Sequence, residues 1–147
     1  MPDLESTLLT LQPALGLARH PWWVLGSAAV VMLSGKADAI RDVDVLLDPR
    51  DVDAVLERLG VVPLVTPPDP QFRSAVFARW TGGALPVELF AGFSLLEAGK
   101  WHSYVPRSRI ELSLGAAGAC VPDRREMIEL LHRFGRPKDL ARAATLT

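Results

Sequence analysis

The chain has 147 residues, a formal net charge of −1 and 49% hydrophobic residues. This length predicts one domain, spanning residues 1–147, with a substantial core. The near-neutral charge argues against a dedicated polybasic nucleic-acid-binding protein. Cys120 is the only cysteine, so neither an intramolecular disulfide nor a metal site built on several thiolates is expected. No signal-peptide pattern and no apolar run of the ~18 residues of a membrane span are present, and we expect a cytoplasmic protein.

The first elements are predicted from apolar periodicity. Leucines at helical spacing predict an amphipathic helix over residues 3–18. The run WWVLG predicts a short buried strand. The alanine-rich run after it predicts a short buried helix, with Ser27 near its start and Gly35 near its end. The stretch DVDVLLD, residues 42–48, predicts a second strand.

The remaining elements complete a mixed α/β pattern. In chain order they are a helix capped by Asp48 and ended by Gly60, a strand pair over 73–80 and 85–90, two short strands over 109–121, a helix from Asp123 to Gly135, and a last helix from Pro137 to about residue 145. No internal repeat, low-complexity tract or linker interrupts this order. The elements therefore predict a compact single domain.

Two aspartates at the start of the second predicted strand raise a physical problem. Side chains alternate along a strand, so Asp42 and Asp44 share one face and repel each other. Buried charge is costly unless it is paired or bound to a metal. A divalent cation resolves the repulsion, because Mg²⁺ prefers carboxylate oxygens. Glu88, in the predicted strand PVELF, is the candidate for a third carboxylate.

The residues upstream of the acids predict a phosphate site. Gly26 and Ser27 form a turn that leads into the predicted buried helix. The start of a helix offers free backbone N–H groups and the positive end of the helix dipole, which together favour phosphate. A strand, a Gly-Ser turn, a helix and a strand with paired acids therefore predict a site for a nucleoside triphosphate and a metal.

This pattern resembles the signature of the nucleotidyltransferase superfamily of the DNA polymerase β type. The signature is a Gly-Gly or Gly-Ser turn, a short helix and then Asp-hydrophobic-Asp on a strand. The spacing from Ser27 to Asp42 is similar to that of the aminoglycoside and lincosamide nucleotidyltransferases. Glu88 in VELF matches the place of the third acid of the family. The segment GRPKDLARA, residues 135–143, is similar to an Arg-Pro-Lys-Asp segment of many small members.

The resemblance implies a fold and a reaction. The fold is α+β, a small mixed β-sheet with helices packed on one side. The reaction moves a nucleoside monophosphate from an NTP, with ATP as the first candidate, to an acceptor hydroxyl and releases pyrophosphate. The cofactor is Mg²⁺ or Mn²⁺. The implied metal ligands and catalytic residues are Asp42, Asp44 and Glu88, of which Glu88 also helps to activate the acceptor, and the implied nucleotide-binding residues are Gly26, Ser27 and Lys138.

Several alternatives stay open at this stage. Ser27 can be a helix cap alone, and Lys138 can be a solvated residue of the last helix. The motif DVDVL also resembles the Asp-x-Asp motif of haloacid dehalogenase-type phosphatases, but KADAIR precedes it in place of an apolar run. The main rival function is a nucleotidyltransferase-like binding or antitoxin-type domain with little or no catalysis. The acceptor, whether small molecule or macromolecule, the nucleotide preference and homo-oligomer formation are not predicted.

Overall fold

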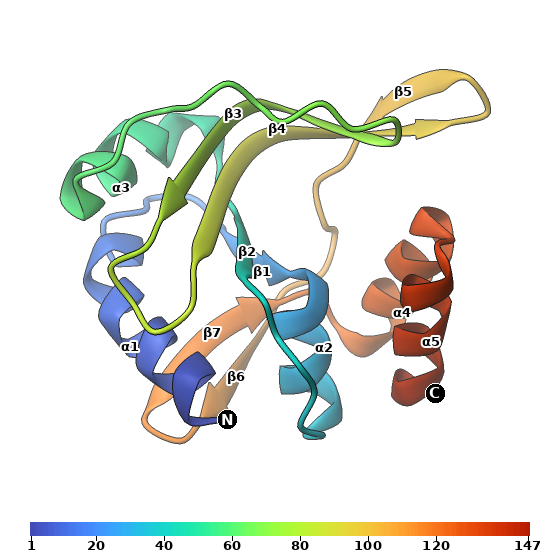
Figure 1. Cartoon of the computed structure of the whole chain (residues 1–147), viewed down its shortest axis with the longest axis horizontal. Helices are drawn as coiled ribbons and strands as arrows, with labels where there is room; N and C mark the ends of the chain where they lie inside the picture. Colours follow the sequence, from blue (N-terminus) through green and yellow to red (C-terminus); the bar gives the residue numbers. More distant parts are fainter.

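The structure is a computed structural model that describes all 147 residues (Figure 1). Its elements in chain order are α1 (Pro2–Leu15), β1 (Trp23–Leu25), α2 (Gly26–Ser34), β2 (Val43–Leu46), the 3-10 turn η1 (Pro49–Asp51), α3 (Val52–Leu59), β3 (Phe72–Trp80), β4 (Val87–Glu97), β5 (Lys100–Ser103), β6 (Ile110–Leu114), β7 (Ala117–Val121), α4 (Arg124–Phe134) and α5 (Pro137–Leu146). The predicted order is confirmed. The exception is β5, a short and largely exposed edge strand that was not predicted. No helix is long and apolar enough to cross a bilayer.

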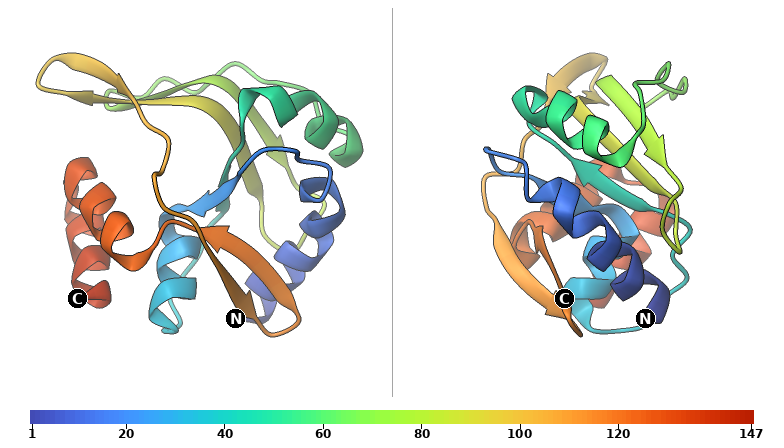
Figure 2. Two further views of the ribbon diagram at one scale, coloured as in Figure 1. Left: turned by 180° about the vertical axis from the view of Figure 1, so that it is seen from behind. Right: turned by 90° about the vertical axis from the view of Figure 1, so that its left-hand side faces the viewer.

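The main sheet is mixed, as predicted. Its order is β1-β2-β4-β3, and β5 pairs with the far end of β4. The central pair, β2 and β4, is parallel, whereas the other neighbouring strands are antiparallel. A separate antiparallel hairpin, β6 and β7, lies with α1 and α2 beneath this sheet in Figure 1, and Figure 2 shows the same layers from behind and from the side. The helices α4 and α5 stand opposite the end of the sheet that carries β5.

Two helix starts differ in detail from their prediction. Asp48 is a cap, but its carboxylate accepts the N–H of Arg50 at 2.9 Å at the start of η1, and α3 begins only at Val52. Asp123 caps α4 as predicted by accepting the N–H of Glu126 at 2.8 Å. Asp123 and Glu126 have the spacing of a capping box, but Glu126 makes no return bond, because its carboxylate accepts donors of the connector between β5 and β6 instead.

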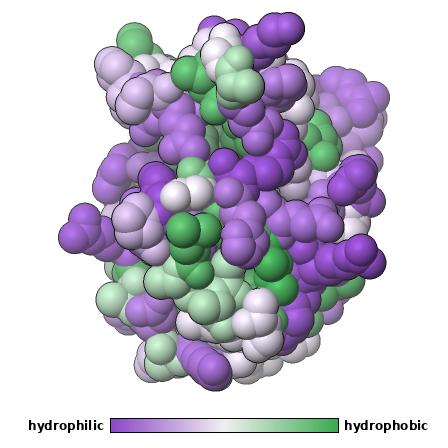
Figure 3. Space-filling view, turned by 90° about the vertical axis from the view of Figure 1, so that its right-hand side faces the viewer, coloured by the Kyte–Doolittle hydropathy of each residue, from purple (hydrophilic) through white to green (hydrophobic).

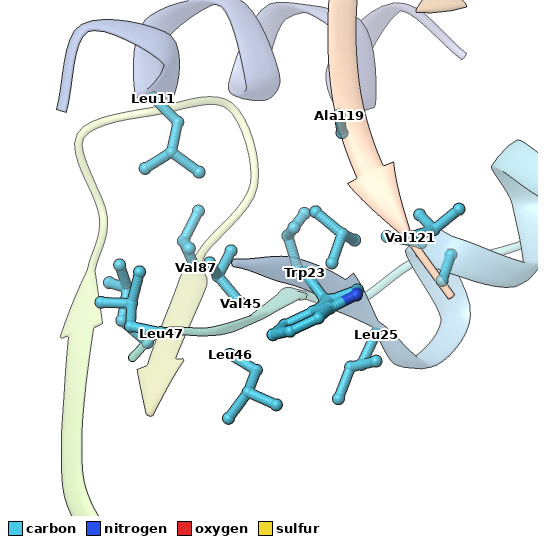
Figure 4. Packing of buried hydrophobic residues seen from close by; sticks show 14 of the residues in the cluster. Leu11, Trp23, Leu25, Val45, Leu46, Leu47, Val87, Ala119 and Val121 are labelled. Carbon is cyan, nitrogen blue, oxygen red and sulfur yellow. The ribbon is translucent and has the colours of Figure 1, made fainter. Parts of the chain in front are cut away.

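The core surrounds β1 and β2. Thirty-six buried apolar residues form one cluster. Figure 4 shows Trp23 and Leu25 of β1 and Val45 of β2 among side chains from α1, β4 and β7. Val43 and Val45 are fully buried, whereas Asp44 between them is partly exposed on the opposite face. Burial of one face of β2 therefore sets the direction of the aspartates on the other.

Candidate functional site

The three predicted carboxylates converge. The parallel pairing of β2 and β4 places Asp44 directly beside Glu88, and the bond from the N–H of Val43 to the carbonyl of Pro86, 2.9 Å, starts this ladder. Asp42 lies two residues before Asp44 and therefore on the same face. One ligand oxygen from each of Asp42, Asp44 and Glu88 lies within 4.8 Å of the others. The predicted strand phase and the place of the third acid agree with this arrangement.

The electrostatics of the cluster favour a bound cation. Burial, together with the charges of Asp42 and Glu88, raises the pKa of Asp44 to about 8. Burial and the charge of Asp42 also raise the pKa of Glu88, against the opposing effect of Arg79. The one ion pair of the cluster joins Arg79 Nη1 to Glu88 Oε1 at 3.5 Å. This is the only ion pair that balances the negative charge of the three carboxylates. Carboxylate oxygens in such an arrangement fit Mg²⁺ or Mn²⁺.

The start of α2 lies against the acids. Gly26 has φ +66°, and a Cβ atom there would lie 2.6 Å from Asp44 Oδ2. The left-handed backbone favours glycine at this position, and a Cβ atom here would also displace the Asp44 carboxylate. Ser27 is the second residue of α2, and no side chain caps this helix. The N–H groups of the first turn have no partner within the helix and are available to an anion.

A single cleft joins these residues to α5. Its volume is about 700 Å³, and it is lined by Gly26, Ser27, the three acids, and the basic residues Lys138 and Arg142 of α5. Lys138 is exposed and lines the cleft, and its role in nucleotide binding stays a prediction. Figure 3 shows the side of the molecule on which α4, α5 and β5 lie, and most of that face is hydrophilic.

Sequence reasoning missed several lining residues. The charge of Arg142 lowers the pKa of Asp44, which brings α5 into the electrostatics of the acids. All five phenylalanines of the chain also line the cleft. The available signal was strand alternation, because Phe90 lies two residues after Glu88 and therefore on the same face. Arg73 and Arg79 are exposed, and they lie in the cleft and beside Glu88 respectively.

Asp139 corrects another interpretation. The sequence allowed Lys138 and Asp139 to be solvated residues of the last helix. Asp139 is instead buried, with 1% exposure. Its carboxylate accepts two hydrogen bonds from the Arg136 guanidinium, at 2.6 and 3.0 Å, and a third from the Arg136 N–H. The pair closes the first turn of α5 and makes this acid a structural element.

Comparison with known proteins identifies the fold. No family model and no curated protein matches the sequence. Among solved structures, a candidate nucleotidyltransferase from Thermotoga maritima is similar with a TM-score of 0.75 and 17% identity, over 95% of this chain and 89% of that chain. The antibiotic-resistance factor ANT(2'')-Ia is similar with a TM-score of 0.60 and 13% identity, over 97% and 80%. The lincosamide antibiotic adenylyltransferase LnuA, solved with lincomycin bound, has a TM-score of 0.55 and 15% identity, over 86% and 85%. The chain therefore has the nucleotidyltransferase fold that the motif around Gly26 and Asp44 predicts.

Proposed function

We propose that the protein transfers a nucleoside monophosphate from an NTP, ATP being the first candidate, to an acceptor hydroxyl. The observation that carries this proposal is the group formed by Asp42, Asp44 and Glu88, which we call the acid cluster. Its ligand oxygens lie within 4.8 Å of one another beside the start of α2. A catalytic role is the simplest reason to gather three carboxylates with one weak ion pair among them. The fold shared with nucleotidyltransferases supports the same reaction class.

Each element of the cleft has a role in this proposal. Asp42, Asp44 and Glu88 hold the divalent cation. When bound, Mg²⁺ supplies charge stabilisation to the transferred phosphoryl group and lowers the pKa of the acceptor hydroxyl. Gly26 and Ser27 offer backbone N–H groups to the triphosphate, and Lys138 offers a positive charge to it.

The acceptor side of the reaction involves Glu88. The acceptor oxygen attacks the α-phosphorus, the bond from that phosphorus to the bridging oxygen breaks, and pyrophosphate leaves. Glu88 accepts the hydroxyl proton. Burial and the charge of Asp42 raise the pKa of Glu88, which is the direction that strengthens a carboxylate as a base. Part of the proposal is also that residues 1–147 act as one domain and that the setting is cytoplasmic.

Two measurements, made one after the other, test the proposed function. Titration calorimetry with MgCl₂ and each NTP measures whether the cleft binds cation and nucleotide. Intact-mass analysis of an acceptor pool from cell extract, incubated with protein, Mg²⁺ and NTP, then measures transfer. We expect an acceptor whose mass rises by one nucleoside monophosphate, with release of pyrophosphate.

The same pair of measurements separates the rival function. A nucleotidyltransferase-like domain that only binds would take up Mg²⁺ and NTP and form no product with any acceptor pool. Absence of both cation and nucleotide binding would contradict the transferase and the nucleotide-binding domain alike, and the acid cluster would then need another explanation.

A further inference from the structure

The phenylalanines form one surface inside the cleft. We call Phe72, Phe77, Phe90, Phe93 and Phe134 the aromatic wall. The ring centroids of Phe72 and Phe134 lie 4.8 Å apart, and those of Phe90 and Phe93 lie 5.3 Å apart. Four of the five rings remain partly exposed, and only Phe93 is buried, with 9% exposure. Phe72, Phe90 and Phe134 pack in part against the core, and all three also line the cleft.

The aromatic wall adjoins the acceptor end of the proposed site. Phe90 follows Glu88 on the same face of β4, and Phe77 of β3 is paired directly with Phe90. The residues proposed to bind the triphosphate lie instead on α2 and α5, and they include Ser27 and Lys138. A molecule whose hydroxyl reaches Glu88 from the sheet side therefore contacts phenylalanine rings.

The charges around the aromatic wall are positive. Among the basic residues that line the cleft, only Arg136 is paired with a carboxylate, and those without an ion pair are Arg41, Arg73, Lys138 and Arg142. Arg73 lies on β3 with its guanidinium 4.2 Å from the centre of the Trp101 ring. This stacking holds a cation at the edge of the aromatic wall.

Few carboxylates lie in this part of the cleft. Outside the acid cluster the lining carboxylates are Asp69 and Asp139. Asp69 is exposed and has no ion pair, and its Oδ1 accepts the N–H groups of Gln71 and Phe72, at 2.8 and 3.0 Å. Asp139 is held by Arg136. Outside the acid cluster, four basic residues of the lining and one carboxylate have no ion pair, so the charges in this part of the cleft favour an anion over an ammonium group.

We propose that the acceptor is a small hydroxyl-bearing aromatic anion, bound by its ring to the aromatic wall and by its negative charge to Arg73. This inference rests on the proposed nucleotidyl transfer and specifies its acceptor class. A polycationic acceptor is disfavoured by the same charges. The cleft volume, about 700 Å³, must hold both acceptor and nucleotide, which favours a small acceptor.

A charge-reversed pair of probes tests the acceptor class. 4-(Hydroxymethyl)benzoate and 4-(aminomethyl)benzyl alcohol share a ring and a hydroxyl but carry opposite charges. Ligand-observed NMR titration measures their affinities for the full chain with Mg²⁺ and a non-hydrolysable ATP analogue. We expect the benzoate to bind about tenfold more tightly than the amine. Equal affinities, or tighter binding of the amine, would overturn the inference.

Three variants sharpen the test. Arg73→Glu should abolish or reverse the preference for the anion, whereas Arg125→Glu, an exposed control outside the cleft, should leave it unchanged. Phe90→Ala should weaken both probes about tenfold and leave binding of the ATP analogue within about twofold of wild type. A Phe90→Ala variant that loses the ATP analogue instead would assign the aromatic wall to the nucleobase and overturn the inference.

The outcomes separate this inference from the function on which it rests. Failure of the wild type to bind Mg²⁺ and the ATP analogue contradicts nucleotidyl transfer itself. Normal binding of both, with no preference for the benzoate, contradicts only the acceptor class. The exposed position of Arg73 keeps its variants informative if Phe90→Ala does not fold.

Discussion

The inward-facing carboxylates of this protein fall into two groups: those that accept several hydrogen bonds from protein donors, and those that face other carboxylates. Glu126, with 6% exposure, accepts hydrogen bonds from the Tyr104 hydroxyl at 3.0 Å, from the N–H groups of Arg107 and Ser108, and from the Ser108 hydroxyl. Burial raises its pKa, but these hydrogen bonds outweigh burial and hold the pKa below its usual range. In the acid cluster, burial and like charge act together, and the pKa of Asp44 rises to about 8.

Asp51 belongs with Glu126. It accepts the N–H groups of Arg19 and His20, at 3.1 and 2.9 Å, and its pKa is also held below the usual range despite burial. The comparison shows that the buried carboxylates that hold the fold together, Asp51 and Glu126, each accept several hydrogen bonds. Asp42, Asp44 and Glu88 instead face one another with one long ion pair among them, which is the arrangement that a cation site requires.

Removing one charge from the acid cluster should have the largest effect. In Asp44→Asn, we expect nucleotidyl transfer to fall at least about a thousandfold, because a phosphoryl-transfer site depends on charges that hold its cation. The metal-free fold should persist, since a repulsion has been removed. Nucleotide incorporation into the acceptor pool measures the first effect and thermal melting with and without Mg²⁺ the second.

Asp53→Asn is the matched control for this change. Asp53 is an exposed acid on α3 and does not line the cleft. It should keep both activity and the stabilisation by Mg²⁺. Equal stabilisation of wild type and Asp44→Asn by Mg²⁺ would show that the acid cluster does not hold the metal.

Removing a satisfied acid should damage the fold and leave the site intact. Glu126→Ala leaves buried donors without an acceptor and should lower the free energy of unfolding by about 3 kcal/mol. Glu129→Ala, on the same helix but half exposed in weak ion pairs of 3.6 and 3.7 Å, should cost less than about 1 kcal/mol. Urea unfolding measures both. Loss of Mg²⁺ affinity in folded Glu126→Ala would contradict the distinction between Glu126 as a structural carboxylate and the acid cluster as the metal site.

The pH dependence of stability should reveal the unsatisfied cluster. Folding raises the pKa of Asp44 from 3.8 to about 8, so the folded state holds a proton that the unfolded chain releases. The resulting stability is complete below pH 4 and disappears as the pH rises through 8. We expect metal-free wild type to lose on the order of 2 kcal/mol over this interval relative to Asp44→Asn, after allowance for solvent screening.

Mg²⁺ supplies the check on this pH profile. Its stabilising effect on wild type should grow from pH 5 to pH 9, because protons and metal compete for the same carboxylates. Urea unfolding at a series of pH values, with EDTA or with MgCl₂, measures both trends. Parallel profiles of metal-free wild type and Asp44→Asn would contradict the coupling of the acids.

A pair of glycine variants should give the smallest effects and the finest distinction. Gly26 and Gly35 both have a positive φ, +66° and +69°, so alanine at either should cost about 1 kcal/mol. A Cβ at Gly26 would also press on Asp44, whereas nothing lies within 4 Å of one at Gly35. We expect Gly26→Ala alone to weaken Mg²⁺ binding, measured by calorimetry. Equal Mg²⁺ affinity in the two variants would show that Gly26 serves only the backbone.

Much of the site is encoded locally. Strand alternation determines that Asp42 and Asp44 share a face, and the Gly-Ser turn before an apolar run determines the start of α2. Glycines stop α2, α3 and α4 where the sequence predicts, because each adopts a left-handed backbone after the last helical residue. These features depend on neighbours within one or two turns of chain, so a single sequence is sufficient to predict them.

Tertiary structure decided the rest. The sequence marks Glu88 as a candidate, but only the parallel register of β2 and β4 places it beside Asp44. The aromatic wall draws residues from positions 72 to 134, and no local periodicity connects β3 with α4. The pairing of Asp139 with Arg136, by contrast, is local, because the two residues lie three positions apart at the start of α5. Local preferences specify elements and faces, whereas strand register and side-chain partners arise from packing between segments that are distant in the chain.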